Sequence, residues 1–338
     1  MSAHRAPALV RFRRMAQAAV IASLCGAAAV PTANQRPAAV ASRADVEIEL
    51  THGGRRRSYV LHVPARRGGS ALPVLIAFHG GGGNAPGFRD YAGLNVVADR
   101  EGFIVAYPNG TGALRNVLLT FNAGNNCCGL AQRQGVDDVG FAMAVVDDVA
   151  RREKIDRSRV YATGHSNGAI MAYRLAAERA DAIAAIAPVA GAMSLDRFAP
   201  SRPVSVLHIH SVDDPRALYE GGTGPPFPGT DNRVQHAPVQ AALDSWIRKN
   251  GCQARPASAE VRRGKAGSAE ATHTATRLVY TPCSTGAEVV HWKLTVAGHG
   301  WPGGNAPVRE QLSGPRTSVI NAAEEIWAFV SRFTTAPR

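Results

Sequence analysis

A serine between two glycines has the sequence context of a nucleophile. Residues 164–168 read Gly-His-Ser-Asn-Gly and match the pattern G-x-S-x-G around Ser166. The motif follows an apolar stretch at 160–163 and precedes good helix formers at 168–180. Strand, tight turn and helix are the context of a nucleophile elbow, in which the turn exposes the serine and side chains at the glycine positions would collide with backbone. The sequence therefore predicts that Ser166 is a nucleophile.

A serine hydroxyl needs a base that takes its proton and a carboxylate that orients the base. In chains with this elbow the order is serine, acid, histidine. His299 lies between two glycines after an apolar strand expected at 288–296, so we predict that it is the base. The acid is expected just past a strand at 204–209, where Asp213 and Asp214 stand side by side. The remaining histidines of this half of the chain are interpreted as packed or surface residues: His208, His210, His236, His273 and His291.

Two backbone N–H groups must stabilise the negative charge that develops on the substrate oxygen. One is expected from Asn167, the residue after the serine, and the other from the loop after the third strand. That loop is the glycine run 80–83, and we predict Gly81 as its donor, with Gly82 as the reserve. The run lacks the G-K-[S/T] of a phosphate loop and the spacing of a dinucleotide fingerprint. No cofactor or metal is expected.

Short apolar runs alternate with longer helical ones along the chain, which predicts an α/β fold with a mainly parallel sheet and helices on both faces. No repeat or second block of composition is present, so residues 42–338 are expected to form one domain. Strands are expected at 46–50, 58–63, 74–78, 103–107, 160–163, 183–189, 204–209, 276–280 and 288–296. Helices are expected at 87–98, 136–154, 168–180, 234–250 and 318–333, with a long loop at 108–135 and a surface excursion at 255–271.

Residues 1–33 have the features of a secretory signal peptide. Four arginines without an acidic neighbour form a basic head, an apolar run follows, and small residues suited to cleavage occur between 29 and 41. The apolar run of about 15 residues is shorter than the roughly 20 that span a bilayer. We expect a secreted protein, extracellular or periplasmic, without stable membrane insertion once the leader is removed. An anchor that is never cleaved is the alternative.

The net positive charge is compatible with polyanion binding but does not favour it. The 338 residues carry 38 Lys+Arg against 26 Asp+Glu, a net charge of +12, with 45% hydrophobic residues. Such a chain can bury a large core and is not globally disordered. The basic residues are almost all arginines, they are scattered, and no nucleic-acid-binding signature is present. We expect no nucleic acid partner.

Five cysteines are too few for a disulfide-built scaffold. Four of them remain once the leader is gone, and four cysteines allow three connectivities. We favour a bridge between Cys252 and Cys283, which would stabilise the chain by about 3–4 kcal/mol. The adjacent Cys127 and Cys128 either pair with each other or stay reduced. None of the cysteines has the C-x-x-C spacing of a zinc or redox site.

Four blocks together resemble the secreted polyhydroxybutyrate depolymerase/feruloyl esterase-like family of α/β-hydrolases. They are Phe-His-Gly-Gly-Gly-Gly-Asn-Ala at 78–85, Cys-Cys-Gly at 127–129 with Val-Asp-Asp-Val-Gly-Phe at 136–141, the serine motif, and His-Gly-Trp-Pro-Gly-Gly at 299–304. The resemblance runs from about residue 50 to 335. It implies an α/β-hydrolase fold and a serine esterase that cleaves carboxylic esters through an acyl-enzyme. The implied substrate is a polyester oligomer or an esterified polysaccharide fragment.

The same resemblance separates the two candidate acids. The family pattern places a proline directly after the catalytic aspartate and Tyr-Glu-Gly-Gly shortly beyond, and Asp214 with residues 215 and 219–222 fits that register. We therefore prefer Asp214 to Asp213. Ser211 and Phe121 stand where family members usually carry glycine and tryptophan, departures that bear on the substrate more than on the triad.

The adjacent carboxylates Asp137 and Asp138 are interpreted as structural, bracing the cysteine loop, because neighbouring residues on a helix diverge by about 100°. Two rival functions stay open for the whole chain. One is a serine peptidase on the same fold. The other is an inactive, basic surface-binding module, which would bind polyanions in a salt-dependent way.

Overall fold

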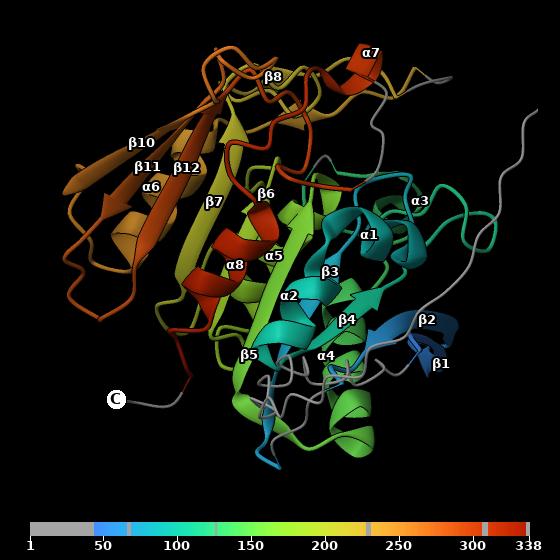
Figure 1. The fold of residues 1–338 in the computed structure, drawn as a ribbon. Helices are drawn as coiled ribbons and strands as arrows, with labels where there is room; N and C mark the ends of the chain where they lie inside the picture. Colours follow the sequence, from blue (N-terminus) through green and yellow to red (C-terminus); the bar gives the residue numbers. More distant parts are fainter. Residues whose placement is uncertain (1–43, 66–68, 126, 228–230, 306–309, 336–338) are drawn as a thin grey trace, which may run out of the picture. The chain divides into compact units, whose positions relative to one another are not determined.

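The computed structural model describes residues 44–65, 69–125, 127–227, 231–305 and 310–335 (Figure 1). The predicted signal peptide at 1–33 lies outside these residues. A ten-stranded sheet has the order β1-β2-β4-β3-β5-β6-β7-β12-β11-β10. Its strands are β1 Val46–His52, β2 Arg55–His62, β3 Leu72–Phe78, β4 Ile104–Pro108, β5 Ile155–His165, β6 Ala185–Val189, β7 Ser205–Ser211, β10 Ser258–Arg263, β11 Thr274–Tyr280 and β12 Val289–Thr295.

The middle of the sheet is parallel and its two edges are antiparallel. Strands β4, β3, β5, β6, β7 and β12 pair in parallel, whereas β1, β2, β11 and β10 pair antiparallel with their neighbours. Strands covered on both faces need apolar side chains throughout, and Leu75, Ile76 and Ala77 of β3 are fully buried. The predicted α/β-hydrolase fold with a mainly parallel sheet is confirmed.

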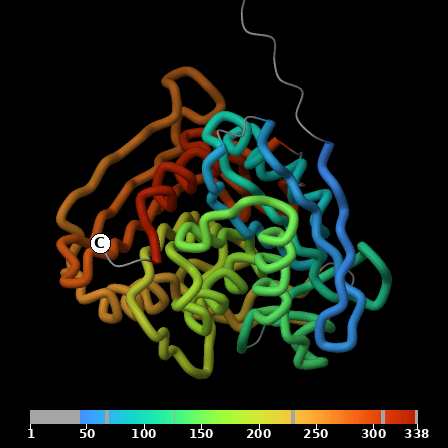
Figure 2. Tube along the Cα trace, turned by 90° about the horizontal axis from the view of Figure 1, so that it is seen from below, coloured from blue at the N-terminus to red at the C-terminus, as the bar shows by residue number. Residues whose placement is uncertain are grey.

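Helices cover both faces of this sheet (Figures 1 and 2). One apolar cluster joins the strands to α1, α2 and α8 through residues such as Phe88, Val97 and Ile326, and another joins them to α4, α5 and α6 through residues such as Met171 and Trp246. The helices are α1 Ala85–Ala92, α2 Leu94–Glu101, α3 Gly129–Arg133, α4 Asp138–Arg152, α5 Asn167–Glu178, α6 Val239–Lys249, α7 Glu310–Ser313 and α8 Ala322–Val330. Among the described residues, no helix has both the length and the apolar composition of a membrane span.

Two predicted helices differ from the observed ones because of single residues. The helix expected at 87–98 is two helices, α1 and α2, since Gly93 adopts a left-handed conformation with φ 69° that ends the first and starts the second. The helix expected at 234–250 begins only at Val239. Pro238 occupies its N-cap, and the residues before it form β9 Gln235–His236, which pairs with β8 Gly222–Thr223.

The surface excursion expected at 255–271 contains an edge strand. Residues 258–263 form β10, which pairs antiparallel with β11 along its whole length. The strand is exposed on both faces apart from one half-buried residue. It therefore lacks the alternation of apolar and polar residues by which a strand is recognised in sequence.

The topology brings four chain segments together at the carboxyl ends of the parallel strands. From β3 the chain crosses to β4 on one side, and β5 pairs with β3 on the other. In open α/β sheets such a switch point leaves a crevice at the carboxyl ends of the strands. The glycine run follows β3 and Ser166 follows β5, while the two candidate acids follow β7 and His299 follows β12.

Candidate active site

Ser166 occupies a sharp turn between β5 and α5. Its backbone has φ 56° and ψ −116°, a conformation that side chains rarely adopt. A Cβ at Gly164 or Gly168 would collide with the backbone oxygen of Phe78 at the end of β3. The tight pairing of β3 with β5 thus requires glycine on both sides of the serine. The turn is anchored by the Ser166 N–H, which donates to the Val189 carbonyl at 2.9 Å.

Asn167 begins helix α5 with a buried side chain that fixes two neighbouring segments. Its amide Nδ2 donates to the Phe121 carbonyl at 3.0 Å and contacts Cys127 Sγ at 3.4 Å, and its Oδ1 accepts from the Phe121 N–H at 2.7 Å. The first N–H groups of a helix have no partner within the helix. The Asn167 N–H is such a group, and the residue lines the same cavity as Ser166.

The glycine loop after β3 lies beside this turn. The Gly82 N–H already donates to the Leu119 carbonyl at 2.8 Å, whereas the Gly81 N–H has no hydrogen-bond partner among the described residues. Gly81 lines the cavity, and a Cβ there would contact Asn167 at 3.6 Å. Of the two glycines considered from sequence, Gly81 is the one with a free donor next to Asn167.

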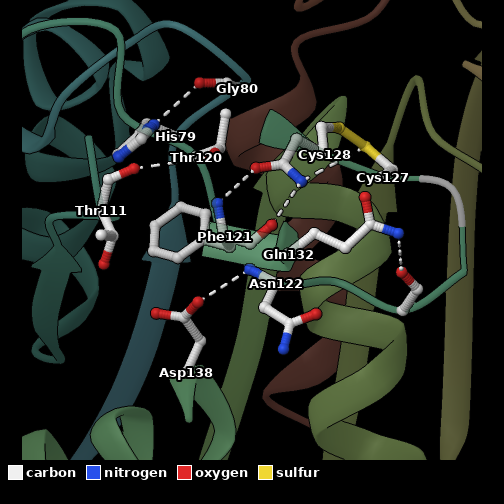
Figure 3. The surroundings of a disulfide bond; sticks show 12 residues. His79, Gly80, Thr111, Thr120, Phe121, Asn122, Cys127, Cys128, Gln132 and Asp138 are labelled. Carbon is white, nitrogen blue, oxygen red and sulfur yellow. Dashed lines mark hydrogen bonds between the residues drawn. A yellow bond between two sulfur atoms is a disulfide. The ribbon is translucent and has the colours of Figure 1, made fainter. Parts of the chain in front are cut away.

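Buried His79 holds the start of this loop. Its Nδ1 donates to the Gly80 carbonyl at 2.8 Å, a contact visible in Figure 3, and its Nε2 accepts from the Gly110 N–H at 3.0 Å. Burial lowers the pKa of His79 to about 4, so the ring is neutral, as one donor and one acceptor require. The Phe121 ring packs against it in a tilted arrangement, with 4.6 Å between the ring centroids.

Asp214 and His299 are in direct contact at the same edge of the sheet. His299 Nδ1 donates to Asp214 Oδ2 at 2.7 Å, and Asp214 Oδ1 accepts from the Arg216 and Ala217 N–H groups at 2.7 and 2.8 Å. A proton on Nδ1 leaves the lone pair of a neutral imidazole on Nε2. His299 and Ser166 line one cavity, although no hydrogen bond between their side chains is present in the described part of the chain.

The environment keeps Asp214 ionised. Burial alone would raise its pKa, but the charge of His299 and the hydrogen bonds from His210 and His299 outweigh burial and hold the pKa of Asp214 well below its usual range. Asp213, by contrast, is exposed. Its carboxylate accepts from the Ser211 hydroxyl and from the Ala297 N–H at 3.3 Å. The structure therefore pairs His299 with Asp214 and not with Asp213.

A cavity of about 200 Å³ opens over the serine. Apolar side chains and the Cys127–Cys128 disulfide form much of its wall, and Arg216, His236 and Ser313 are its polar members beside the candidate site residues. Burial lowers the pKa of His236 to about 4, so this ring is neutral at neutral pH. The apolar lining residues are Ile170, Ala217, Pro225, Phe227, Val234 and Leu312.

The cysteines form two disulfides, Cys127–Cys128 and Cys252–Cys283. The second bridge was predicted, and the first decides between the two alternatives left open for the adjacent pair. Figure 3 shows the first bridge, and the Asn167 amide links Cys127 to the backbone of Phe121. The residues described contain no cluster of three or more His, Cys, Asp or Glu suited to a metal ion.

The adjacent carboxylates 137 and 138 are both structural, as predicted. Asp138 pairs with buried Arg57 at 2.6 Å and accepts from the Asn122 N–H at 2.7 Å, which braces the loop before the disulfide (Figure 3). Asp137 caps α4 by accepting from the Gly140 N–H at 2.8 Å, and it contacts His52 at the same distance.

Two histidines near the site were not assigned a role from sequence. His210, interpreted as a packed residue, lies with Nε2 at 3.1 Å from Asp214 Oδ2. His165, the variable residue of the serine motif, donates from Nε2 to the His299 carbonyl at 3.0 Å, and burial lowers its pKa to about 3. The spacing His-x-His in β7 was the available signal for His210, because residues two apart on a strand share a face.

A second hollow lies away from the serine. It has a volume of about 270 Å³ and lies between β2 and the segment 109–119. Four arginines and Glu49 line it, and none of the site residues predicted from sequence does. The arginines are Arg55, Arg56, Arg57 and Arg115.

Known proteins resemble this chain in sequence. The family model described as "Esterase PHB depolymerase" matches residues 57–251. "Putative esterase NocK" from Nocardia uniformis subsp. tsuyamanensis is 32% identical over 303 residues, which cover 86% of this chain and 83% of that protein. "Feruloyl esterase D" from Neurospora crassa is 27% identical over 266 residues, or 78% of this chain and 73% of that protein.

A solved structure shares the fold at low sequence identity. "Crystal Structure of a Thermostable Esterase" aligns with a TM-score of 0.50 and 14% identity, covering 86% of this chain and 63% of that one. At this identity the likeness supports the architecture of the sheet and its helices, and the chemistry rests on the site itself.

Proposed function

The chain belongs to the PHB depolymerase esterase family, and from this premise we propose that it is a serine esterase with Ser166 as nucleophile, His299 as base and Asp214 as orienting acid. As a member of this family it is a carboxylic ester hydrolase. The observation that supports the proposed roles best is the 2.7 Å contact of His299 with an ionised Asp214, combined with the cavity that His299 and Ser166 share.

The first half of the proposed reaction forms an acyl-enzyme. Ser166 Oγ attacks the ester carbonyl while His299 Nε2 takes its proton, which gives a tetrahedral oxyanion. The imidazolium then gives that proton to the alcohol oxygen as the carbon–oxygen bond breaks, and the alcohol leaves. In the second half, His299 removes a proton from water, and the water oxygen attacks the acyl carbon. As the bond between this carbon and Ser166 Oγ breaks, the imidazolium returns the proton to Oγ, which releases the acid and regenerates the serine.

Two backbone donors would stabilise the oxyanion. The Asn167 N–H lies at the start of α5, and the Gly81 N–H on the facing loop has no partner in the part of the chain that the structure describes. Each such donor typically contributes roughly a hundred- to a thousandfold in rate. Both belong to segments that the Asn167 side chain, Phe121 and His79 hold together, so the donors are positioned before the substrate arrives.

The substrate we propose is a short polyester oligomer or an esterified polysaccharide fragment. An apolar cavity of about 200 Å³ suits a small acyl or aryl group, and named relatives include feruloyl esterases. We further propose that the protein is secreted. The basic and apolar leader and the Cys252–Cys283 bridge both fit an oxidising compartment.

An alkyl fluorophosphonate probe tests the nucleophile. We expect it to label the wild-type protein with a stoichiometry of one, and Ser166→Ala to abolish both labelling and hydrolysis of an aryl ester. Ser313→Ala is the matched control, because Ser313 lines the same cavity and its side chain has no role in the proposed chemistry. Mass spectrometry locates the adduct. Labelling that persists in Ser166→Ala would show that another residue is the nucleophile.

A further inference from the structure

The Asp214 carboxylate, which contacts His299, also contacts a second imidazole. Asp214 Oδ2 lies 2.7 Å from His299 Nδ1 and 3.1 Å from His210 Nε2. His210 Nε2 is also 2.8 Å from the Ala217 carbonyl. Both partners of Nε2 are acceptors, so this nitrogen must carry a proton and donate. His210 lies on β7, four residues before Asp214, and is buried.

The other side of His210 continues into a chain of buried hydrogen bonds. His210 Nδ1 lies 3.1 Å from His208 Nε2, and His208 Nδ1 lies 3.0 Å from the Tyr173 hydroxyl. Tyr173 comes from α5, the helix that starts at the serine turn. The sequence of groups is therefore Tyr173, His208, His210 and Asp214.

Each buried donor in this series of hydrogen bonds needs an acceptor, and this requirement fixes which atom donates in each bond. Tyr173 is fully buried, and burial raises the pKa of Tyr173 well above its ordinary value, so its hydroxyl keeps its proton. His208 Nδ1 is the only acceptor for that proton among the described residues. Burial also lowers the pKa of His208 well below its ordinary value, so this ring is neutral. It must then donate from Nε2 to His210 Nδ1.

An acceptor at Nδ1 and a donor at Nε2 define a neutral His210. Every hydrogen bond in the chain then points toward Asp214. This state also suits the proposed reaction, in which His299 becomes positively charged. A second cation on the same carboxylate oxygen would oppose that charge. The titratable groups around His210 come from β5, β7, β9, β12 and the neighbouring loops, and they are Asp214, His165, His208, Tyr219, His236, His291, Lys293 and His299.

We infer that His210 is a positioning residue for the esterase reaction: it holds the Asp214 carboxylate in place and, polarised by Tyr173 and His208, withdraws negative charge from the oxygen that serves His299. The inference rests on the proposed function. His210 does not line the cavity, so its removal affects the proton transfers and leaves substrate binding unchanged.

The experiment measures kcat and KM against pH for an aryl ester. In His210→Phe, Asp214 Oδ2 loses a donor and holds the imidazolium more strongly. We expect the midpoint of the acidic limb of kcat/KM to rise by roughly 0.5–1 pH unit. We expect the plateau kcat to fall roughly tenfold at unchanged KM. His210→Gln keeps an N–H donor at the Nε2 position and should restore most of the wild-type midpoint.

Two further variants separate this role from a general packing effect. His291→Phe is the matched control, because His291 is equally buried, contacts the His208 carbonyl and the Tyr219 hydroxyl, and does not touch Asp214. We expect it to leave the midpoint unmoved. Tyr173→Phe removes the first donor of the chain and should move the midpoint upward by less than His210→Phe does. It also decides the matter if His210→Phe does not fold.

The outcomes distinguish the inference from the proposed function. A midpoint that stays at the wild-type value in His210→Phe, or in Tyr173→Phe if the former does not fold, overturns the inference while ester turnover and fluorophosphonate labelling persist. An equal shift in His291→Phe or in His210→Gln also overturns it, because the shift would not depend on the donor to Asp214. If the wild-type protein shows neither turnover nor labelling, it is the proposed function that fails.

Discussion

Asp214 combines full burial with the largest set of donors at the site. Two backbone N–H groups bind one of its oxygens and two imidazoles bind the other. Because a buried carboxylate stays ionised only when such donors compensate for lost hydration, the donors and the charge are parts of one arrangement. The neighbouring Asp213 is exposed and accepts from the Ser211 hydroxyl and the Ala297 N–H, but it has no contact with His299 among the described residues.

This contrast gives a prediction for a pair of adjacent substitutions. Asp214→Asn replaces the acceptor facing His299 Nδ1 with an amide that can donate, which favours the wrong tautomer of the imidazole. We expect kcat/KM to fall by about 10⁴-fold. Asp213→Asn should change kcat/KM by less than about threefold, because the exposed Asp213 carboxylate has no contact with His299 among the described residues and its Oδ1 acceptor is kept in the amide. Steady-state hydrolysis of an aryl ester measures both, and equal losses in the two variants would contradict the assignment of the acid.

At the scale of elements, the serine turn depends on how closely β3, β5 and α5 approach one another. Phe78, at the end of β3, pairs in register with Gly164, at the end of β5. The helix then starts at Asn167 directly over the same backbone. Gly168 has no unusual backbone conformation, and the reason for glycine there is the lack of space for a Cβ. Gly102 is the opposite case, with open space around it but a φ of 79°.

We therefore expect two glycine-to-alanine substitutions to differ in size and in consequence. Gly168→Ala forces apart backbone at the site, which should lower the free energy of unfolding by about 2–4 kcal/mol and slow fluorophosphonate labelling. Gly102→Ala should lower the free energy of unfolding by only about 1–2 kcal/mol, because a side chain is placed in the left-handed conformation, and labelling should be unchanged. Urea unfolding and labelling rates test both. An active, fully stable Gly168→Ala protein would rule out the close approach of these elements.

At the scale of the whole molecule, the two disulfides have different tasks. Cys252–Cys283 joins the end of α6 to the turn between β11 and β12, across 31 positions of sequence. Closing a loop of this length removes much of the freedom of the unfolded chain. Cys127–Cys128 joins neighbours and closes almost no loop, but it lines the cavity and contacts the Asn167 amide.

Paired serine substitutions should separate stability from activity. Cys252→Ser with Cys283→Ser should lower the free energy of unfolding by about 3–4 kcal/mol and leave kcat/KM within about twofold. Cys127→Ser with Cys128→Ser should change stability less and lower kcat/KM at least about tenfold, through loss of the cavity wall and of a contact to Asn167. Urea unfolding and ester hydrolysis measure the two effects. The hypothesis is wrong if the first pair is the one that loses activity.

Several parts of the site are already visible in the sequence, for a local reason. Ser166 stands out because the turn that exposes it admits only glycine nearby, and the flanking strand and helix are contiguous with it. His299 stands out through the glycines beside it, and the proposed oxyanion loop through four consecutive glycines. The parallel core of the sheet can also be predicted from sequence, because strands buried on both faces must be apolar throughout.

Tertiary structure decided what depends on burial and on distance between chain segments. Spacing alone left Asp213 and Asp214 open and the family register only favoured Asp214, whereas the structure places Asp214 buried and in contact with His299. His210 looked like an ordinary strand residue, because its role comes from Asp214 on one side and a tyrosine of α5 on the other. The edge strand β10 was missed for a related reason, since an exposed strand is held by its hydrogen-bonded neighbour rather than by its own side chains. A sequence shows the steric needs of a turn, but the partners of a buried charge exist only once the chain has folded.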